Sequence, residues 1–292
     1  MDLAFLLAKN KQKFKRQTIK LQKSQLFIRE VPLATAWVGG GTWDAAVIAA
    51  RMIERMDLKF QNSLELGSGS GLLGLVVGQQ IPTIMTDYML PIIENLQYNI
   101  WTNSFEAKER AQEFFDKKVD IDNFVISGQQ IISNCSAGYL NWYEPHEELV
   151  LADGHVINSY MPPGQFLARK QPQNQKFELI YGSELTYSLV NYIELVNTIE
   201  IYLADNGVFW EILSLFRGIG PLKFLEELEI RNYYIQVRHV STEFYGKIGS
   251  LQEKNRQEQY ILFTVSKQEN AIQFGSEPLL NWREIQFTNV NE

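Results

Sequence analysis

The sequence predicts an α/β fold built on a mainly parallel sheet with crossover helices, and three observations support this class. A short apolar run at residues 60–66 ends in a cluster of glycines, and apolar residues at helical spacing follow at 72–80. The same order of strand and helix repeats at 83–86 and 90–101. Strands that alternate with helices indicate parallel pairing, because each connection must cross the sheet before the next strand begins.

Two segments precede this core. Residues 18–31 alternate well enough to predict a pair of strands packed beside the main domain, and residues 42–56 carry apolar side chains at helical spacing. We therefore expect residues 1–34 to form an N-terminal basic segment with a strand pair. Residues 35–292 are expected to form the main domain.

The middle of the chain has a different composition. It is charged from 104 to 122 and rich in turn-forming residues from 131 to 176, where Met161, Pro162, Pro163 and Gly164 are consecutive. Long stretches without periodicity inside a compact domain indicate a connection or an insertion. The sequence therefore predicts an irregular insertion around residues 104–176 and no separate folded domain there.

Regular structure is expected again in the last part of the chain. The pattern predicts, in chain order, a strand at 177–181, a helix at 189–203, a strand at 207–213 and a helix at 222–229. Two alternating segments, 234–240 and 259–265, follow and are joined by a polar link. We expect them to pair as an antiparallel finish to the sheet.

The composition restricts the chemistry. With 292 residues, of which 45% are hydrophobic, the chain can bury a sizeable core. The single Cys135 excludes an internal disulfide framework, and His146, His155 and His239 are not spaced as metal ligands. A reducing setting without a metal site is therefore expected.

The charge argues against a nucleic-acid surface over the whole protein, because the formal net charge is −7. One exception is a basic N-terminal stretch that could touch RNA or a ribosomal surface, although a solvated terminus is the simpler interpretation. It comprises Lys9, Lys11, Lys13, Lys15, Arg16, Lys20 and Lys23. We find neither a signal peptide nor the roughly 20 apolar residues of a membrane helix, so we expect a cytoplasmic or nuclear monomer.

The central motif is a glycine turn between a strand and a helix. Gly67, Gly69 and Gly71 occupy alternate positions, Glu65 lies two residues before the first of them, and Asp87 ends the next strand. Glycines permit a sharp turn whose backbone amides approach a ligand at the start of a helix. Gly69, Gly71 and Gly74 also have the spacing of a dinucleotide-binding turn. An acid at position 65 favours a cofactor that carries an ammonium group, whereas an acid at position 87 would accept hydrogen bonds from ribose hydroxyls in either kind of cofactor.

This turn resembles that of the class I, or seven-strand, methyltransferases. The resemblance implies a Rossmann-like, doubly wound sheet of seven strands that is mostly parallel with an antiparallel final strand. It also implies S-adenosyl-L-methionine as the cofactor, with its methionine part held by the glycine turn and its ribose by Asp87.

Three further segments resemble the family 16 protein methyltransferases, which modify lysine or histidine side chains of other proteins. They contain Trp43, Trp142 and the run from Ser183 through Glu184 to Tyr187. The resemblance implies that Trp43 and Ser183 border the cofactor, that Trp142 lies by the adenine, and that Glu184 and Tyr187 form an acid-x-x-Tyr motif beside the acceptor nitrogen.

The acceptor nitrogen could belong to a lysine or to a histidine side chain. Trp-Asp-Ala-Ala at 43–46 is closer to lysine-directed members, whereas Ser-Glu-x-x-Tyr at 183–187 is closer to histidine-directed ones, and 216–220 resembles an aromatic-Gly-Val-Gly segment of the latter. We narrowly favour histidine, with lysine as the alternative. The resemblance suggests a ribosomal protein or a translation factor as the substrate.

Other interpretations stay open at this point. Trp43 and Trp142 could be core aromatics, Glu184 could cap a helix, and Tyr187 could be packed with a satisfied hydroxyl. The fold could also serve a nucleic-acid methyltransferase, a nicotinamide-dependent oxidoreductase or a scaffold without catalysis. A nucleic-acid amine methyltransferase would be expected to carry Asp or Asn before Pro-Pro and an aromatic where residues 182–185 stand.

Overall fold

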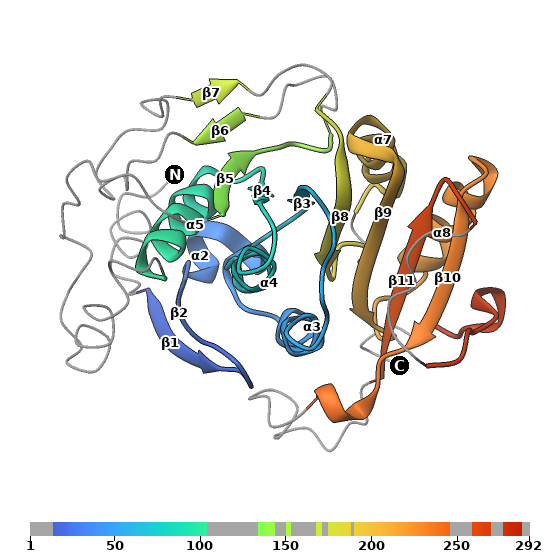
Figure 1. Cartoon of the computed structure of the whole chain (residues 1–292), viewed down its shortest axis with the longest axis horizontal. Helices are drawn as coiled ribbons and strands as arrows, with labels where there is room; N and C mark the ends of the chain where they lie inside the picture. The colour runs from blue at the N-terminus through green and yellow to red at the C-terminus, as the bar shows by residue number, and fades with distance from the viewer. Residues whose placement is uncertain are drawn as a thin grey trace.

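The computed structural model describes residues 14–103, 134–143, 150–152, 168–170, 175–187, 190–245, 259–269 and 277–287. Within these residues the protein is built on one nine-stranded sheet with a two-stranded hairpin beside it. Figure 1 shows the large sheet as a curved layer with helices on both sides. No helix in the described ranges is long and apolar enough to cross a membrane.

Seven strands of the large sheet form the predicted fold. In spatial order they are β10 (Tyr234–His239), β11 (Tyr260–Ser266), β9 (Leu203–Ser214), β8 (Phe177–Ser183), β3 (Ser63–Glu65), β4 (Thr83–Asp87) and β5 (Cys135–Tyr139). The pairs between β9 and β5 are parallel, and β11 is antiparallel to both of its neighbours. The Rossmann-like fold class, with its antiparallel final strand, is confirmed.

Helices cover both faces of this sheet, as a doubly wound fold requires. One face is covered by α3 (Asp44–Ile53), α4 (Leu72–Val77) and α5 (Leu90–Thr102), and the other by α7 (Tyr192–Tyr202) and α8 (Gly220–Ile230). Neighbouring residues of one strand point to opposite cores: Tyr181 and Trp210 pack under α3 and α4, whereas Ile180 and Phe209 pack under α7 and α8. Burial on both faces explains why these strands are continuously apolar.

The predicted strand pair is a hairpin of β1 (Lys15–Lys20) and β2 (Gln25–Glu30). Its apolar residues Leu26 and Ile28 belong to the same core as α3, α4 and α5. Asparagines at intervals of four residues on α5 bind the backbone of β2. Asn103 exchanges hydrogen bonds with Phe27, and Asn99 does so with Arg29. The hairpin is therefore fixed to the helix that follows β4.

The expectation that residues 104–176 are irregular is wrong for three segments. Strand β5 follows β3 and β4 in the chain and pairs with β4 in parallel. Strands β6 (Val150–Ala152) and β7 (Ala168–Lys170) extend the sheet beyond β5 by antiparallel pairing. The pattern missed β5 because Cys-Ser-Ala-Gly-Tyr has no β-branched residue, although its pairing with β4 buries it. The Met161 to Gly164 turn and the basic Lys9, Lys11 and Lys13 lie outside the described residues.

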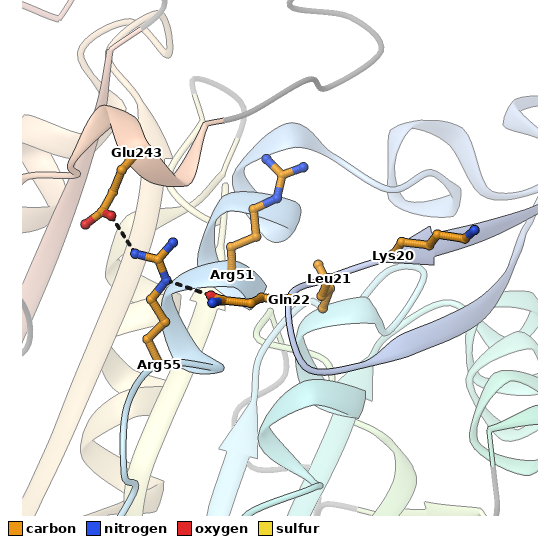
Figure 2. A pocket seen from close by; sticks show the side chains of 6 residues that line it. All are labelled: Lys20, Leu21, Gln22, Arg51, Arg55 and Glu243. Atoms are coloured by element: carbon orange, nitrogen blue, oxygen red, sulfur yellow. Dashed lines mark hydrogen bonds and ion pairs between the residues drawn. The ribbon is translucent and has the colours of Figure 1, made fainter.

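A polar cavity of about 290 Å³ lies between the β1–β2 turn, the end of α3 and the short helix η3 (Thr242–Phe244). Figure 2 shows Arg55 between Gln22 and Glu243, with which it forms a hydrogen bond and an ion pair. Arg51 donates to the carbonyl oxygens of Phe244 and Tyr245. These arginines therefore join three separate chain segments at this cavity.

Candidate functional site

The glycine turn connects β3 to α4 at the carboxyl end of the central strands. Gly67, Gly69 and Gly71 have φ angles of 57°, 52° and 79°, a backbone region that side chains with a Cβ rarely adopt. A Cβ on Gly69 would lie 2.8 Å from the carbonyl oxygen of Gly39. This position is therefore restricted both by its φ and by the close approach of the segment before α3.

Glu65 ends β3 directly below this turn and is 3% exposed. Its Oε2 atom and the hydroxyl of Ser68 are buried and have no hydrogen-bond partner among the described residues. Burial raises the pKa of the Glu65 carboxyl to about 8, because no water stabilises its charged form. A buried carboxylate oxygen without a donor suits a ligand that brings donors and positive charge.

Asp87 ends β4, the neighbouring strand, and is also buried. Its carboxylate accepts hydrogen bonds from the backbone N–H of Tyr88 at 2.8 Å, of Met89 at 3.2 Å and of Gly69 at 3.4 Å. Burial raises its pKa to about 6, and these three donors act in the opposite direction. Asp87 thus connects the glycine turn to the start of α5.

The two tryptophans lie on different sides of the turn. Trp142 follows β5, and its ring would be 3.4 Å from a Cβ on Gly67. Trp43 precedes α3, is 42% exposed, and donates from Nε1 to the carbonyl oxygen of Val38 at 3.0 Å. An exposed indole with a bonded Nε1 does not fit the alternative of a buried core aromatic for Trp43.

The acid-x-x-Tyr segment leaves the carboxyl end of β8, where Ser183 pairs with Ile212 of β9. Leu185 reaches back to the glycine turn, since a Cβ on Gly67 would lie 3.0 Å from its side chain. Glu184 has a φ of 57°, which is rare for a residue with a side chain and stores strain. The structure therefore brings this segment against the glycine turn.

Three residues that the sequence analysis did not select hold this segment. Glu211 of β9 is fully buried and accepts hydrogen bonds from the backbone N–H of Leu185 at 2.7 Å and of Thr186 at 3.0 Å. The Glu184 carboxylate accepts from the backbone N–H of Ser214 at 3.3 Å and from Nε of Arg217. The sequence signal for Glu211 is an acid in the middle of an apolar strand, which is costly without such donors. Arg217 lies in the 216–220 segment noted in the sequence, but no role was given to it there.

Tyrosines surround the open side of the site. Tyr187 is 37% exposed, and both Tyr88 and Tyr143 are more exposed. Partial burial raises the pKa of Tyr187, with further contributions from Tyr88, Tyr143 and Asp87, so these four groups lie near one another. The Tyr143 hydroxyl also accepts a hydrogen bond of 3.5 Å from the N–H of Asn191. The hydroxyl of Tyr187 is thus placed on the same side as Asp87.

Comparison with known proteins agrees with this arrangement. Residues 20–115 match the family model described as "Lysine methyltransferase". The chain is 23% identical over 236 residues to the protein N-terminal and lysine N-methyltransferase EFM7 of Kluyveromyces lactis, covering 75% of each chain. It is 27% identical over 107 residues to the protein N-lysine methyltransferase METTL21A of Danio rerio, covering 35% of this chain and 49% of that relative. The chain is therefore similar to protein lysine methyltransferases, and the match to the family model lies in its first 115 residues.

A solved structure is also similar, with a low TM-score over most of both chains. The TehB-like S-adenosylmethionine-dependent methyltransferase of Corynebacterium glutamicum superposes with a TM-score of 0.43 at 14% identity, covering 81% of this chain and 92% of that one.

The residues present fit the cofactor of a class I methyltransferase, S-adenosyl-L-methionine. The unpartnered Glu65 oxygen is buried beside Gly74 of α4, and the three glycines with positive φ place no Cβ in the turn. The amino group of the methionine part would supply donors to Glu65, and the ribose hydroxyls would supply donors to Asp87. Which residues contact the cofactor stays a prediction, and it includes Trp43, Trp142 and Ser183.

Proposed function

We propose that this protein transfers a methyl group from S-adenosyl-L-methionine to the ε-amino group of a lysine in another protein. The observation that carries the proposal is the packing of the Glu184–Tyr187 segment against the glycine turn through Leu185. This packing supports a position of the Glu184 carboxylate and the Tyr187 phenol near the methyl group of the bound cofactor. Support for lysine comes from the relatives, since EFM7 and METTL21A are both named as lysine methyltransferases.

The chemistry requires alignment and a neutral amine. The bound cofactor supplies a methyl group on a positively charged sulfur. The nitrogen lone pair forms the new C–N bond while the C–S bond breaks and its electron pair stays on sulfur, which gives S-adenosylhomocysteine. The amine must first release its proton to solvent, and Glu184 with Tyr187 would then orient its lone pair.

The narrow preference for histidine receives no support from the relatives, so lysine replaces it as the proposed acceptor. A ribosomal protein or a translation factor as the substrate, and a place in the cytoplasm or the nucleus, are kept as part of this proposal. They derive from the resemblance noted in the sequence, and each needs its own test. The basic N-terminal stretch offers a further contact to such a substrate.

The test begins with transfer of a labelled methyl group to fractionated cell proteins, followed by mass spectrometry of the labelled peptides. We expect N-methyl-lysine as the product. Methylated histidine or a methylated α-amine in its place would overturn the lysine assignment while keeping the enzyme class.

A matched pair of variants separates an enzyme from a scaffold. Glu184→Gln should bind S-adenosylmethionine like the unsubstituted protein and lose turnover on the order of a hundredfold or more, because it removes an orienting carboxylate. Arg231→Gln breaks an ion pair with Glu227 and Glu200 on the other side of the sheet and should change neither quantity. Full turnover in Glu184→Gln would contradict the role given to this residue.

A further inference from the structure

Arg217 contacts residues on both sides of the proposed acceptor site. Its Nε donates to Oε2 of Glu184, and the two side chains are 22% and 7% exposed. Its guanidinium carbon also lies 5.4 Å from the ring centroid of Trp43, within the range of a cation–π contact. One side chain therefore joins the segment after β8 to the residue that precedes α3.

The backbone that follows Arg217 packs closely against the segment that carries Glu184. Gly218 has a φ of 68°, and a Cβ on Gly220 would lie 2.7 Å from the carbonyl oxygen of Thr186. The loop that carries Arg217 can approach the Glu184 segment this closely only because position 220 has no side chain. The ion pair is thus built into the loop, in contrast to a chance contact between long surface side chains.

The ion pair between Arg217 and Glu184 affects the protonation of a lysine acceptor. An unpaired carboxylate beside the substrate would stabilise the ammonium form, which has no lone pair for methyl transfer. Among the described residues, the other titratable groups near this segment are the buried acids Glu211, Glu65 and Asp87 and the tyrosines Tyr88, Tyr143 and Tyr187. Burial raises the pKa of Glu211 and of Glu65 to about 8 and that of Asp87 to about 6, so the first two are mostly neutral near pH 7.

We infer that Arg217 is a positioning residue that neutralises Glu184, so that Glu184 can orient the acceptor amine without holding it as an ammonium ion. The inference rests on the proposed lysine methylation. Glu184 keeps one oxygen on the N–H of Ser214 and the other on Arg217, so its carboxylate plane is fixed while its charge is balanced. Trp43 limits the positions that the guanidinium can take.

The experiment is a profile of kcat and KM against pH, measured on a methyl-accepting lysine substrate with the full chain. Arg217→Gln removes the guanidinium charge from Glu184, so the rising limb of the kcat profile should move about one unit toward higher pH. Turnover should then fall about tenfold near pH 7 and recover at high pH. Arg217→Lys keeps the charge and should shift the limb less.

Two controls make the result decisive. The double variant Arg217→Gln/Glu184→Gln has no unpaired carboxylate, so its limb should return to the original pH although kcat stays low. Binding of S-adenosylmethionine, followed by calorimetry, should be unchanged in Arg217→Gln. This second readout reports whether the site is still folded.

Each remaining outcome counts against one proposal. A loss of kcat in Arg217→Gln that is equal at every pH, or a weakened cofactor affinity, would show that Arg217 serves only to maintain the structure. An unsubstituted enzyme that methylates histidine and no lysine would overturn the proposed function, whatever the variants do.

Discussion

The side-chain amide of Asn99 donates a hydrogen bond of 2.8 Å to the carbonyl oxygen of Ser70, in the middle of the glycine turn. The same amide group donates to the carbonyl of Arg29 in β2 and accepts from its N–H, both at 2.9 Å. One fully buried residue of α5 thus connects the N-terminal hairpin to the expected cofactor site. The position of the hairpin is therefore linked through Asn99 to the conformation of the glycine turn.

Replacing Asn99 tests this path. Asn99→Ala removes three hydrogen bonds to buried backbone groups, although Asn95 still donates to the Arg29 carbonyl, so we expect it to lower the free energy of unfolding by about 2–4 kcal/mol. It should also weaken S-adenosylmethionine binding, because the Ser70 carbonyl is no longer held. Chemical denaturation and calorimetry measure the two effects.

The matched control is Asn95→Ala one turn earlier on α5. Asn95 is equally buried; it accepts from Nε of Arg29 and donates to the Arg29 carbonyl oxygen, and within the described part of the chain these hydrogen bonds do not reach the glycine turn. It should destabilise the fold while leaving cofactor affinity in the remaining folded protein unchanged. Equal losses of affinity in both variants would argue against a specific path through Asn99.

The glycine turn itself allows a sharper comparison. In Gly69→Ala a Cβ would be forced into a positive φ and to 2.8 Å from the Gly39 carbonyl oxygen, whereas a Cβ at Gly41 meets no atom within 4 Å. We expect Gly69→Ala to reduce cofactor affinity at least tenfold and Gly41→Ala to leave it intact. Calorimetric titration of both variants is sufficient. A cofactor affinity that survives in Gly69→Ala would exclude this turn as the binding element.

The strongest periodicities were the most predictable parts of the fold. The helix α5 and strand β4 fall within a residue or so of the expected ranges, and the three glycines at 67, 69 and 71 do have positive φ. Strand β5 could not be found in this way, because a strand of small residues is stabilised by its neighbours and has little pattern of its own.

In the candidate site, too, residues marked by a local sequence pattern could be predicted, and residues brought in by tertiary structure could not. Glu65 and Asp87 were found because strand ends mark them in the sequence. Arg217 and Glu211 act on Glu184 and Leu185, which are about 30 positions away in the chain, and only tertiary structure brings them together. No local pattern distinguishes an arginine that orients a carboxylate from one on the surface.

Glu211 offers a test of how the Glu184 segment is held. Glu211→Leu removes the acceptor for two buried N–H groups and for the hydroxyl of Thr186, so we expect a loss of about 2–4 kcal/mol in unfolding free energy. Glu211→Gln keeps an acceptor oxygen without the charge and should retain most of the stability and turnover. A Gln variant as unstable as the Leu variant would show that an amide oxygen cannot replace the Glu211 carboxyl as the acceptor.

The raised pKa of Glu65 leads to a prediction for cofactor binding. Because the pKa is about 8 in the free protein, most Glu65 carboxyls are protonated at pH 7. A cofactor that brings an ammonium group favours the charged carboxylate, lowers this pKa and expels the proton. Binding should therefore release close to one proton at pH 7 and fewer as the pH approaches 8, where about half of the Glu65 carboxyls are already ionised.

Calorimetric titrations in buffers with different ionisation enthalpies count the released protons directly. In Glu65→Gln the release should disappear and the affinity should fall, because the amide cannot pair with the ammonium group. The sign for folding is opposite: a carboxyl whose pKa is raised on folding makes the free protein less stable as the pH increases from about 4.5 through 8. The cofactor should therefore stabilise the protein against heat more strongly at pH 8.5 than at pH 6, and equal stabilisation at both would place its ammonium group away from Glu65.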